Sequence, residues 1–234
     1  MIEEYSRLKK FLESLFILIG LSMVAYHMIS TQRLFLGSFE HQNLHLMFAL
    51  VLTFMGALLK SKNWLNSLWL YLMITISLIG TIYVFVHMEH LEEVTGFPDP
   101  LDIFIGLLLM IAVIEATRQA WGWTLPIVAI IFIAYFAFGH YIPGPLYHRP
   151  FGFDYMISYL CIGFTGVYGT FLSISANAIF MFVVFGGLLG VIKVTDVLYE
   201  LGKVFGKVLE GGPGQTAVVS SCLLYTSPSP RDPE

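Results

Sequence analysis

The sequence has very little charge for its length. Only 12% of its 234 residues are charged, whereas 57% are hydrophobic and the mean hydropathy is +0.77. A soluble domain of this size needs far more charge to cover its surface. The shortage therefore excludes an ordinary soluble protein and predicts an all-α integral membrane protein.

Cysteines and catalytic motifs are also scarce. Cys161 and Cys222 lie far apart in apolar surroundings, and the sequence contains no C-x-x-C. A disulfide framework is therefore excluded. No P-loop, nucleophile elbow or zinc-protease signature occurs, so we expect neither an enzyme nor a covalently bound cofactor, and no nucleic-acid partner.

What the sequence does contain is long apolar runs. Six of them can cross a bilayer core, which takes about 20 helical residues, and they are too long and continuous for strands. Their approximate ranges are 12–30, 43–60, 67–87, 101–119, 124–142 and 170–192. The first run could be read as a signal peptide, but no small-x-small cleavage site follows it, so an uncleaved span is predicted.

The basic residues predict an orientation. Leaving Arg231 aside, two fall on one side of the predicted membrane, Arg33 and Arg149. Nine fall on the other side: Arg7, Lys9, Lys10, Lys60, Lys62, Arg118, Lys193, Lys203 and Lys207. Because Lys and Arg accumulate in cytoplasmic loops, the amino terminus is predicted to be cytoplasmic.

Two further segments differ from ordinary spans. Residues 193–210 carry apolar side chains on one helical face and end at the "GGPG" of 211–214, which predicts an amphipathic helix in the cytoplasmic interface or against a helix end. Residues 151–169 are mostly apolar with a thin polar stripe. They are either interfacial, the interpretation we favour, or a short buried helix that leads into the sixth span.

Three polar features are candidate sites. Glu115 and Arg118 are spaced to share a helix face, which favours interfacial anchoring, with a polar lock between helices as the alternative. In "HMEHLEEV", residues 87–94, His87 and His90 beside three glutamates suggest a metal, but no matching ligand set is evident elsewhere. A solvated outward loop is therefore favoured there, and its acidity could help to dock a partner protein.

The third feature is polar and small residues in the sixth span. Ser173, Ser175 and Asn177 precede a G-x-x-x-G formed by Gly186 and Gly190. Close helix packing is favoured, and lining a transport path is the alternative. The remaining histidines at 27, 45, 140 and 148 are predicted to need no special role, and the six spans show neither a central acidic residue nor a clear helix break.

Three runs resemble a known transporter family. "EATRQAWGWTLPIVAIIFIAYFAFGHYIPGPLYHRPF", residues 115–151, is similar to the joining region of fused TRAP (tripartite ATP-independent periplasmic) transporter permeases. "GVYGTFLSISANAIFMFVVFGGLLG" and "GKVLEGGPGQTAVVSS" resemble the opening of their large permease module. The subtype that these runs resemble works with TAXI-type binding proteins.

The resemblance implies a domain plan. Residues 1–120 would be a four-helix scaffold module, 121–150 a connecting helix with an outer loop, and 151–224 the start of the large module. Residues 225–234, "YTSPSPRDPE", depart from the family pattern and are predicted to be a non-native tail. The substrate and sodium site is expected beyond residue 224, so no binding residue is named.

The resemblance also implies a function. We expect a permease of the bacterial inner membrane, in which a periplasmic binding protein delivers an organic anion, commonly a carboxylate, and a Na⁺ gradient drives its uptake. The alternative is a stand-alone structural or assembly subunit of the membrane with no transport path of its own.

Overall fold

The computed structural model describes residues 2–32, 36–94, 96–163, 165–194, 197 and 200. All regular structure in this part of the chain is helical. Within the described residues, six helices are long and apolar enough to span a membrane: Lys9–Ser30, Ser38–Lys60, Trp64–Val86, Pro100–Trp121, Thr124–Tyr141 and Phe153–Val191. The predicted all-helical architecture with six membrane-length helices is thus confirmed, and the first five ranges agree with the sequence to within a few residues.

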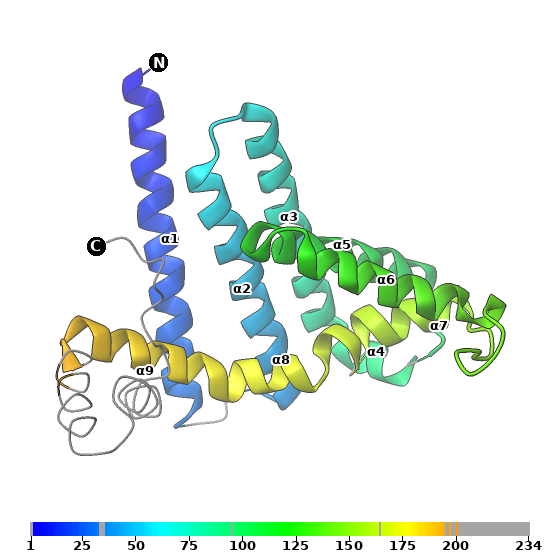
Figure 1. Ribbon diagram of the computed structural model, residues 1–234. Helices are drawn as coiled ribbons and strands as arrows, with labels where there is room; N and C mark the ends of the chain where they lie inside the picture. The colour runs from blue at the N-terminus through cyan, green and yellow to red at the C-terminus, as the bar shows by residue number, and fades with distance from the viewer. Residues whose placement is uncertain are drawn as a thin grey trace, which may run out of the picture. The chain divides into compact units, whose positions relative to one another are not determined.

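The chain divides into two compact units, residues 1–176 and 177–234. The first unit begins with α1 (Ile2–Ser30), α2 (Ser38–Lys60) and α3 (Trp64–Val86). α2 packs against both of its neighbours, and α2 and α3 form an antiparallel hairpin (Figure 1). The Asn63 side chain accepts a hydrogen bond from the Leu65 amide at 3.1 Å, so this residue caps the start of α3.

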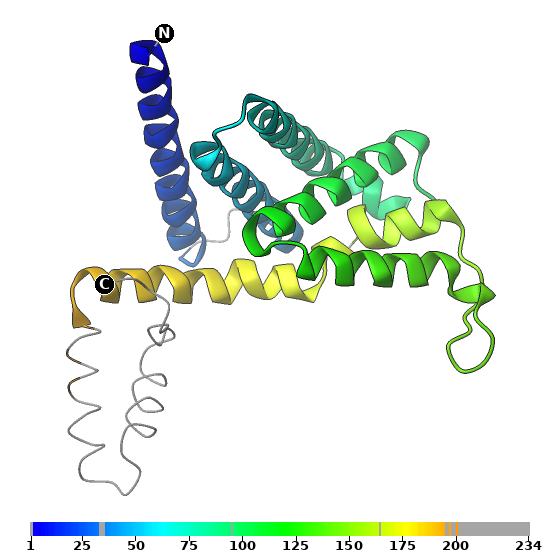
Figure 2. The same cartoon turned by 45° about the horizontal axis from the view of Figure 1, so that its top comes forward.

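A short helix, α4 (Met88–Glu93), leads to the central helix of this unit, α5 (Pro100–Trp121). α5 begins with a reciprocal capping box between Asp99 and Asp102, and Pro100 occupies its first turn. Gly122 ends it with φ 74°, a left-handed conformation that glycine adopts without strain. The chain then turns back into α6 (Thr124–Phe138), which lies beside α5 in Figure 2.

The stretch 153–179 is helical but repeatedly interrupted. α7 (Phe153–Ile157) and the π turn η2 (Ser158–Ile162) are followed by η3 (Gly166–Tyr168), α8 (Thr170–Ile174) and a second π turn, η4 (Ser175–Ile179). At the interruption, Gly166 has φ 52°, and a Cβ there would collide with the backbone of Leu160. The sixth span is therefore less regular than the sequence predicts, since the second π turn lies inside it.

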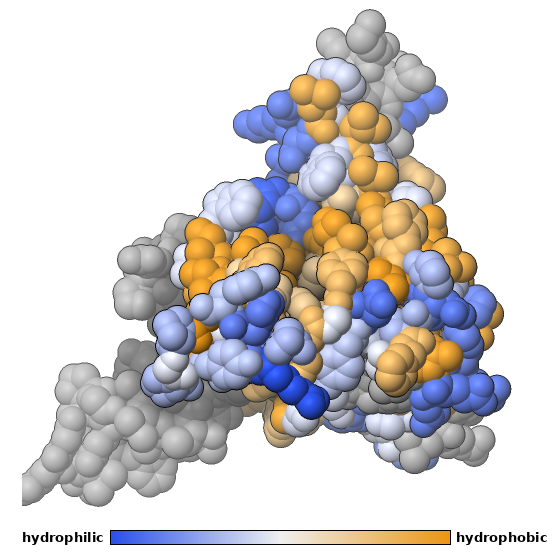
Figure 3. Space-filling model, turned by 90° about the vertical axis from the view of Figure 1, so that its right-hand side faces the viewer, coloured by the Kyte–Doolittle hydropathy of each residue, from blue (hydrophilic) through white to orange (hydrophobic). Residues whose placement is uncertain are grey.

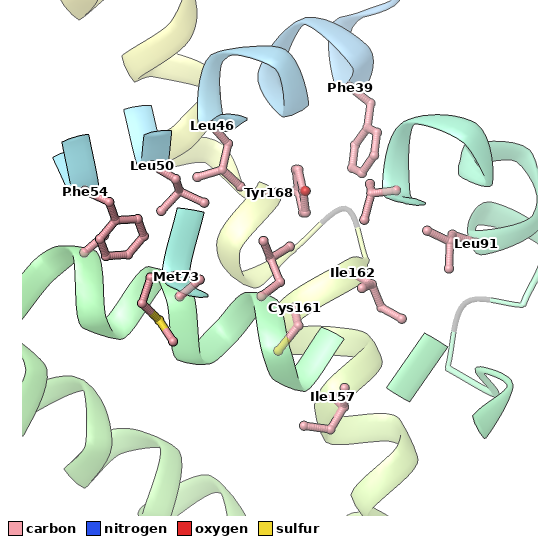
Figure 4. Close-up of a cluster of buried hydrophobic side chains, with 14 of the residues drawn as sticks. Phe39, Leu46, Leu50, Phe54, Met73, Leu91, Ile157, Cys161, Ile162 and Tyr168 are labelled. Carbon is pink, nitrogen blue, oxygen red and sulfur yellow. The ribbon is translucent and has the colours of Figure 1, made fainter. Parts of the chain in front are cut away.

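Residues 151–169 are built into the hydrophobic core. Ile157, Cys161, Ile162 and Tyr168 are each at most 2% exposed and join a cluster with side chains of α2, α3 and α5 (Figure 4). This packing supports the alternative interpretation, a short buried helix that leads into the following span. Phe153, Tyr155 and Tyr159 are 38–57% exposed, so the segment also has an open face, and the interfacial interpretation stays a prediction.

Large apolar side chains also cover much of the surface of the first unit. On α6, Leu125, Ile131 and Phe132 are 49–65% exposed, and Figure 3 shows many other apolar side chains on one face of the molecule. Water would disfavour such a surface, whereas hydrocarbon would not. The exposed apolar faces therefore support the interpretation of these helices as membrane spans.

In the second unit the described structure is mainly α9 (Phe180–Val191), which follows the second π turn. The predicted amphipathic helix over 193–210 lies almost wholly outside the described residues. The "GGPG" of 211–214 and the predicted tail over 225–234 also lie outside them.

Candidate functional site

A buried amide joins three segments of the first unit. Asn43 of α2 is 2% exposed, and its side-chain nitrogen donates to the Thr81 carbonyl of α3 at 2.8 Å. The Tyr168 hydroxyl, from η3, donates to its side-chain oxygen at 2.7 Å. Both ends of the amide are thus satisfied, which offsets the cost of burying it. Asn43 thereby fixes the register of the 166–168 turn against the α2–α3 hairpin.

Two histidines make a second buried connection beside this amide. His27 of α1 is 1% exposed and His45 of α2 is 4% exposed. The His45 Nδ1 lies 3.0 Å from the His27 Nε2, and the His45 Nε2 lies 3.2 Å from the Ser175 hydroxyl. The chain of contacts therefore runs from α1 through α2 to residue 175.

The Met23 carbonyl, at one end of this series of contacts, determines which atom donates in each of its hydrogen bonds. The His27 Nδ1 lies 2.9 Å from the Met23 carbonyl, which can only accept, so this nitrogen carries a proton. With both rings neutral, the His27 Nε2 then accepts from the His45 Nδ1, and the Ser175 hydroxyl donates to the His45 Nε2. A neutral, fully paired arrangement suits a buried site, because a charged imidazole would lose its hydration there.

Tyr26 and His41 border this chain of histidines. The Tyr26 hydroxyl lies 2.8 Å from the His41 Nδ1, and the His27 and His41 ring centroids are 5.0 Å apart.

We call the group of Asn43, Tyr168, His27, His45 and Ser175 the polar junction. It holds helix packing in register, and its histidines are the titratable groups through which protonation could change that packing.

Glu115 and Arg118 form a polar lock, as the alternative interpretation predicted. The Trp69 indole of α3 donates to the Glu115 carboxylate at 3.0 Å, which joins α3 to α5. Arg118 bonds the same carboxylate at 2.6 and 2.7 Å, and Gln119 donates to it at 2.8 Å. Glu115 is only 9% exposed and its carboxylate is bonded from a second helix, so it does more than anchor a helix end at an interface.

The other predicted candidates are only partly brought together. Of the polar residues in the sixth span, Ser175 reaches the polar junction, whereas Ser173 lies on α8 and Asn177 in the second unit. Gly186 and Gly190 lie on α9, in the second unit, and the close packing predicted for this G-x-x-x-G stays a prediction.

The segment 87–94 is also more ordered than a solvated loop. It contains α4, which places exposed Glu89, Glu92 and Glu93 on its surface and turns half-buried His90 toward the start of α5. The segment predicted to be a solvated outward loop thus contains a short helix over 88–93 whose glutamates are exposed.

The sequence held weak signals for the residues that it did not identify. His41 and His45 are spaced to share one helix face, and Gln42 and Asn43 lie between them in an otherwise apolar run. These signals do not say which helix the residues meet. Among known proteins, no family model, curated protein or solved structure matches this chain.

Proposed function

We propose that this chain is the scaffold part of the permease of a sodium-coupled secondary transporter for organic anions, of the fused TRAP type. A TAXI-type periplasmic binding protein would deliver the carboxylate substrate, and Na⁺ would be the coupling ion. The membrane would be the bacterial inner membrane, with the amino terminus in the cytoplasm. The resemblance of residues 115–151, 166–190 and 206–221 to such permeases is the basis of the proposal.

One structural observation supports it most strongly. Residues 153–176, part of the predicted start of the transport module, are packed against the helices of the predicted scaffold and tied to them by two side-chain hydrogen bonds, one buried and one half-buried. These are Tyr168 to Asn43 and Ser175 to His45. A scaffold must hold the static part of a transporter in place while another part moves. Hydrogen bonds between buried side chains restrict the contact between two helices to one register.

The lock at Glu115 supports the same role. It joins α3 to α5 through a carboxylate that is bonded from both helices, whereas the polar junction joins α1, α2 and α3 to residues 168 and 175. The helices of residues 1–121 are thus braced at two separate places. Rigid bracing of this kind is what an elevator-like carrier requires of its static part.

Uptake in the native host tests the proposal. Deletion of the gene should abolish sodium-dependent uptake of at least one radiolabelled carboxylate from a panel, and a plasmid copy of the genomic gene should restore it. A plasmid copy with Asn43→Ala should restore less uptake at equal membrane abundance. Unchanged uptake of the whole panel in the deletion strain would overturn the proposal.

The second candidate is a structural or assembly subunit. It is favoured by Asn43, since both ends of its buried amide are satisfied within the chain. In that case the deletion would lower the membrane abundance of another complex. Sodium-dependent uptake of carboxylates would be unchanged by the deletion.

A further inference from the structure

Three metal-ligating side chains converge where α4 meets the start of α5. The His90 Nε2 lies 3.3 Å from the Asp102 Oδ2 and 3.4 Å from the Asp99 Oδ2. One ligand atom from each of the three residues lies within 4.8 Å of the others. His90 comes from α4, whereas Asp99 and Asp102 come from the first turn of α5, so the fold assembles the set.

These separations suit a shared metal ion. Zinc lies about 2.0–2.2 Å from nitrogen and oxygen ligands, and a tetrahedral arrangement then separates neighbouring ligand atoms by about 3.4 Å. Direct N–H···O hydrogen bonds are most often about 2.9–3.0 Å long. The distances from His90 to both carboxylates are therefore longer than good hydrogen bonds and match two edges of a zinc tetrahedron.

Surrounding groups hold the ligands in place. The Asp102 side chain is fully buried, and the Tyr83 hydroxyl donates to its Oδ1 at 2.6 Å. The Asp99 amide donates to its Oδ2 at 2.9 Å. Outer hydrogen bonds of this kind orient carboxylate ligands and are typical of metal sites.

The charge at this place also favours a cation. Among the described residues, the ion pairs of Asp99 and Asp102 are with His90 and not with any Lys or Arg. Exposed Glu89, Glu92 and Glu93 on α4 add negative charge nearby. A buried carboxylate without a full counter-charge is costly, and a divalent ion would supply that charge.

We propose that His90, Asp99 and Asp102 bind one divalent transition-metal ion of the zinc class, with water completing its coordination. The imidazole ligand favours zinc, cobalt or nickel over magnesium and calcium. The Asp99 side chain is 67% exposed and that of His90 38%, which leaves an open side for water. The ion would clamp α4 onto the start of α5, and this role does not depend on the proposed transport function.

Metal binding to the full chain tests this site. The protein, purified in nanodiscs through a tag without histidine, should bind one Zn²⁺ per chain by calorimetry. Co²⁺ should give the visible d–d absorption of a low-coordinate site. His90→Gln and Asp99→Asn should each weaken Zn²⁺ binding at least about tenfold. Circular dichroism should show both variants folded, because both side chains are partly exposed.

His87→Gln and Glu93→Gln are the matched controls, a nearby histidine and a nearby carboxylate outside the trio. They should leave the Zn²⁺ affinity unchanged. The site is refuted if the wild-type chain binds no Zn²⁺ at millimolar concentration. It is equally refuted if binding survives both His90→Gln and Asp99→Asn.

Discussion

Replacement of Tyr168 by phenylalanine should destabilise the fold through one lost hydrogen bond. The phenolic hydroxyl donates to the Asn43 side-chain oxygen at 2.7 Å, and both residues are 2% exposed. The ring itself stays, so its packing against Phe39, at a centroid distance of 4.7 Å, is preserved and no large cavity forms. The cost is therefore that of a buried acceptor left without a partner, about 1–3 kcal/mol of unfolding free energy.

The assay is unfolding of the detergent-solubilised chain by SDS titration, followed by circular dichroism. The matched control is Tyr159→Phe, since Tyr159 is 44% exposed and its hydroxyl makes no hydrogen bond among the described residues. The control should change the free energy by less than about 0.5 kcal/mol. The double variant Asn43→Ala with Tyr168→Phe should cost less than the sum of the single changes, because Asn43→Ala already removes the acceptor. Equal effects at positions 159 and 168, or strict additivity, would refute the reasoning.

Three further predictions concern other parts of the chain. Glu115→Ala should lower the unfolding free energy by about 1–3 kcal/mol, because it leaves the Trp69 indole and Arg118 without their acceptor. Trp69→Phe should lower it by only about 0.5–1.5 kcal/mol. Equal losses for the two variants in the same SDS titration would contradict the lock. The His148 ring nitrogens face the carbonyls of Tyr135 at 3.0 Å and Arg149 at 2.7 Å, which raises the pKa of His148, since only the protonated ring donates to both. The protonated His148 ring stabilises this loop fully below the unfolded pKa of about 6.5, and this stabilisation is lost as the pH rises through the higher folded pKa. Limited proteolysis of 143–149 should therefore speed up above neutral pH. The variant His148→Gln should remove this dependence on pH. In a variant without Cys161 and Cys222, an impermeant maleimide should label Leu36→Cys in intact cells and Lys62→Cys only after permeabilisation; the reverse would overturn the orientation.

The general architecture follows from the sequence because it rests on local properties. Run length and hydropathy predict where membrane-length helices lie, and these depend on each segment alone. The end of α5 is similarly local, since Gly122 supplies the left-handed residue at which the helix stops. The sequence also predicts the lock at Glu115 as an alternative, because a carboxylate and a guanidinium three residues apart share a helix face.

The polar junction and the His90 trio depend on packing between segments, which the sequence does not specify. His27 and His45 are 18 residues apart in sequence and meet only because α1 packs against α2. The sequence suggests the neighbouring glutamates as the partners of His90, whereas its carboxylate partners are Asp99 and Asp102 at the start of α5. The burial of Ile157, Cys161 and Ile162 against α5 likewise depends on packing between segments, which hydropathy alone does not give.

The proposed scaffold role is tested most directly by flux through the isolated chain. Liposomes that contain only the purified 234-residue protein would receive an inward Na⁺ gradient and a radiolabelled carboxylate. The account predicts no accumulation above that of empty liposomes, because the described helices brace one another and the buried side chains of Asn43, His45 and Glu115 are hydrogen-bonded within the chain. Gradient-dependent accumulation of the carboxylate would contradict it.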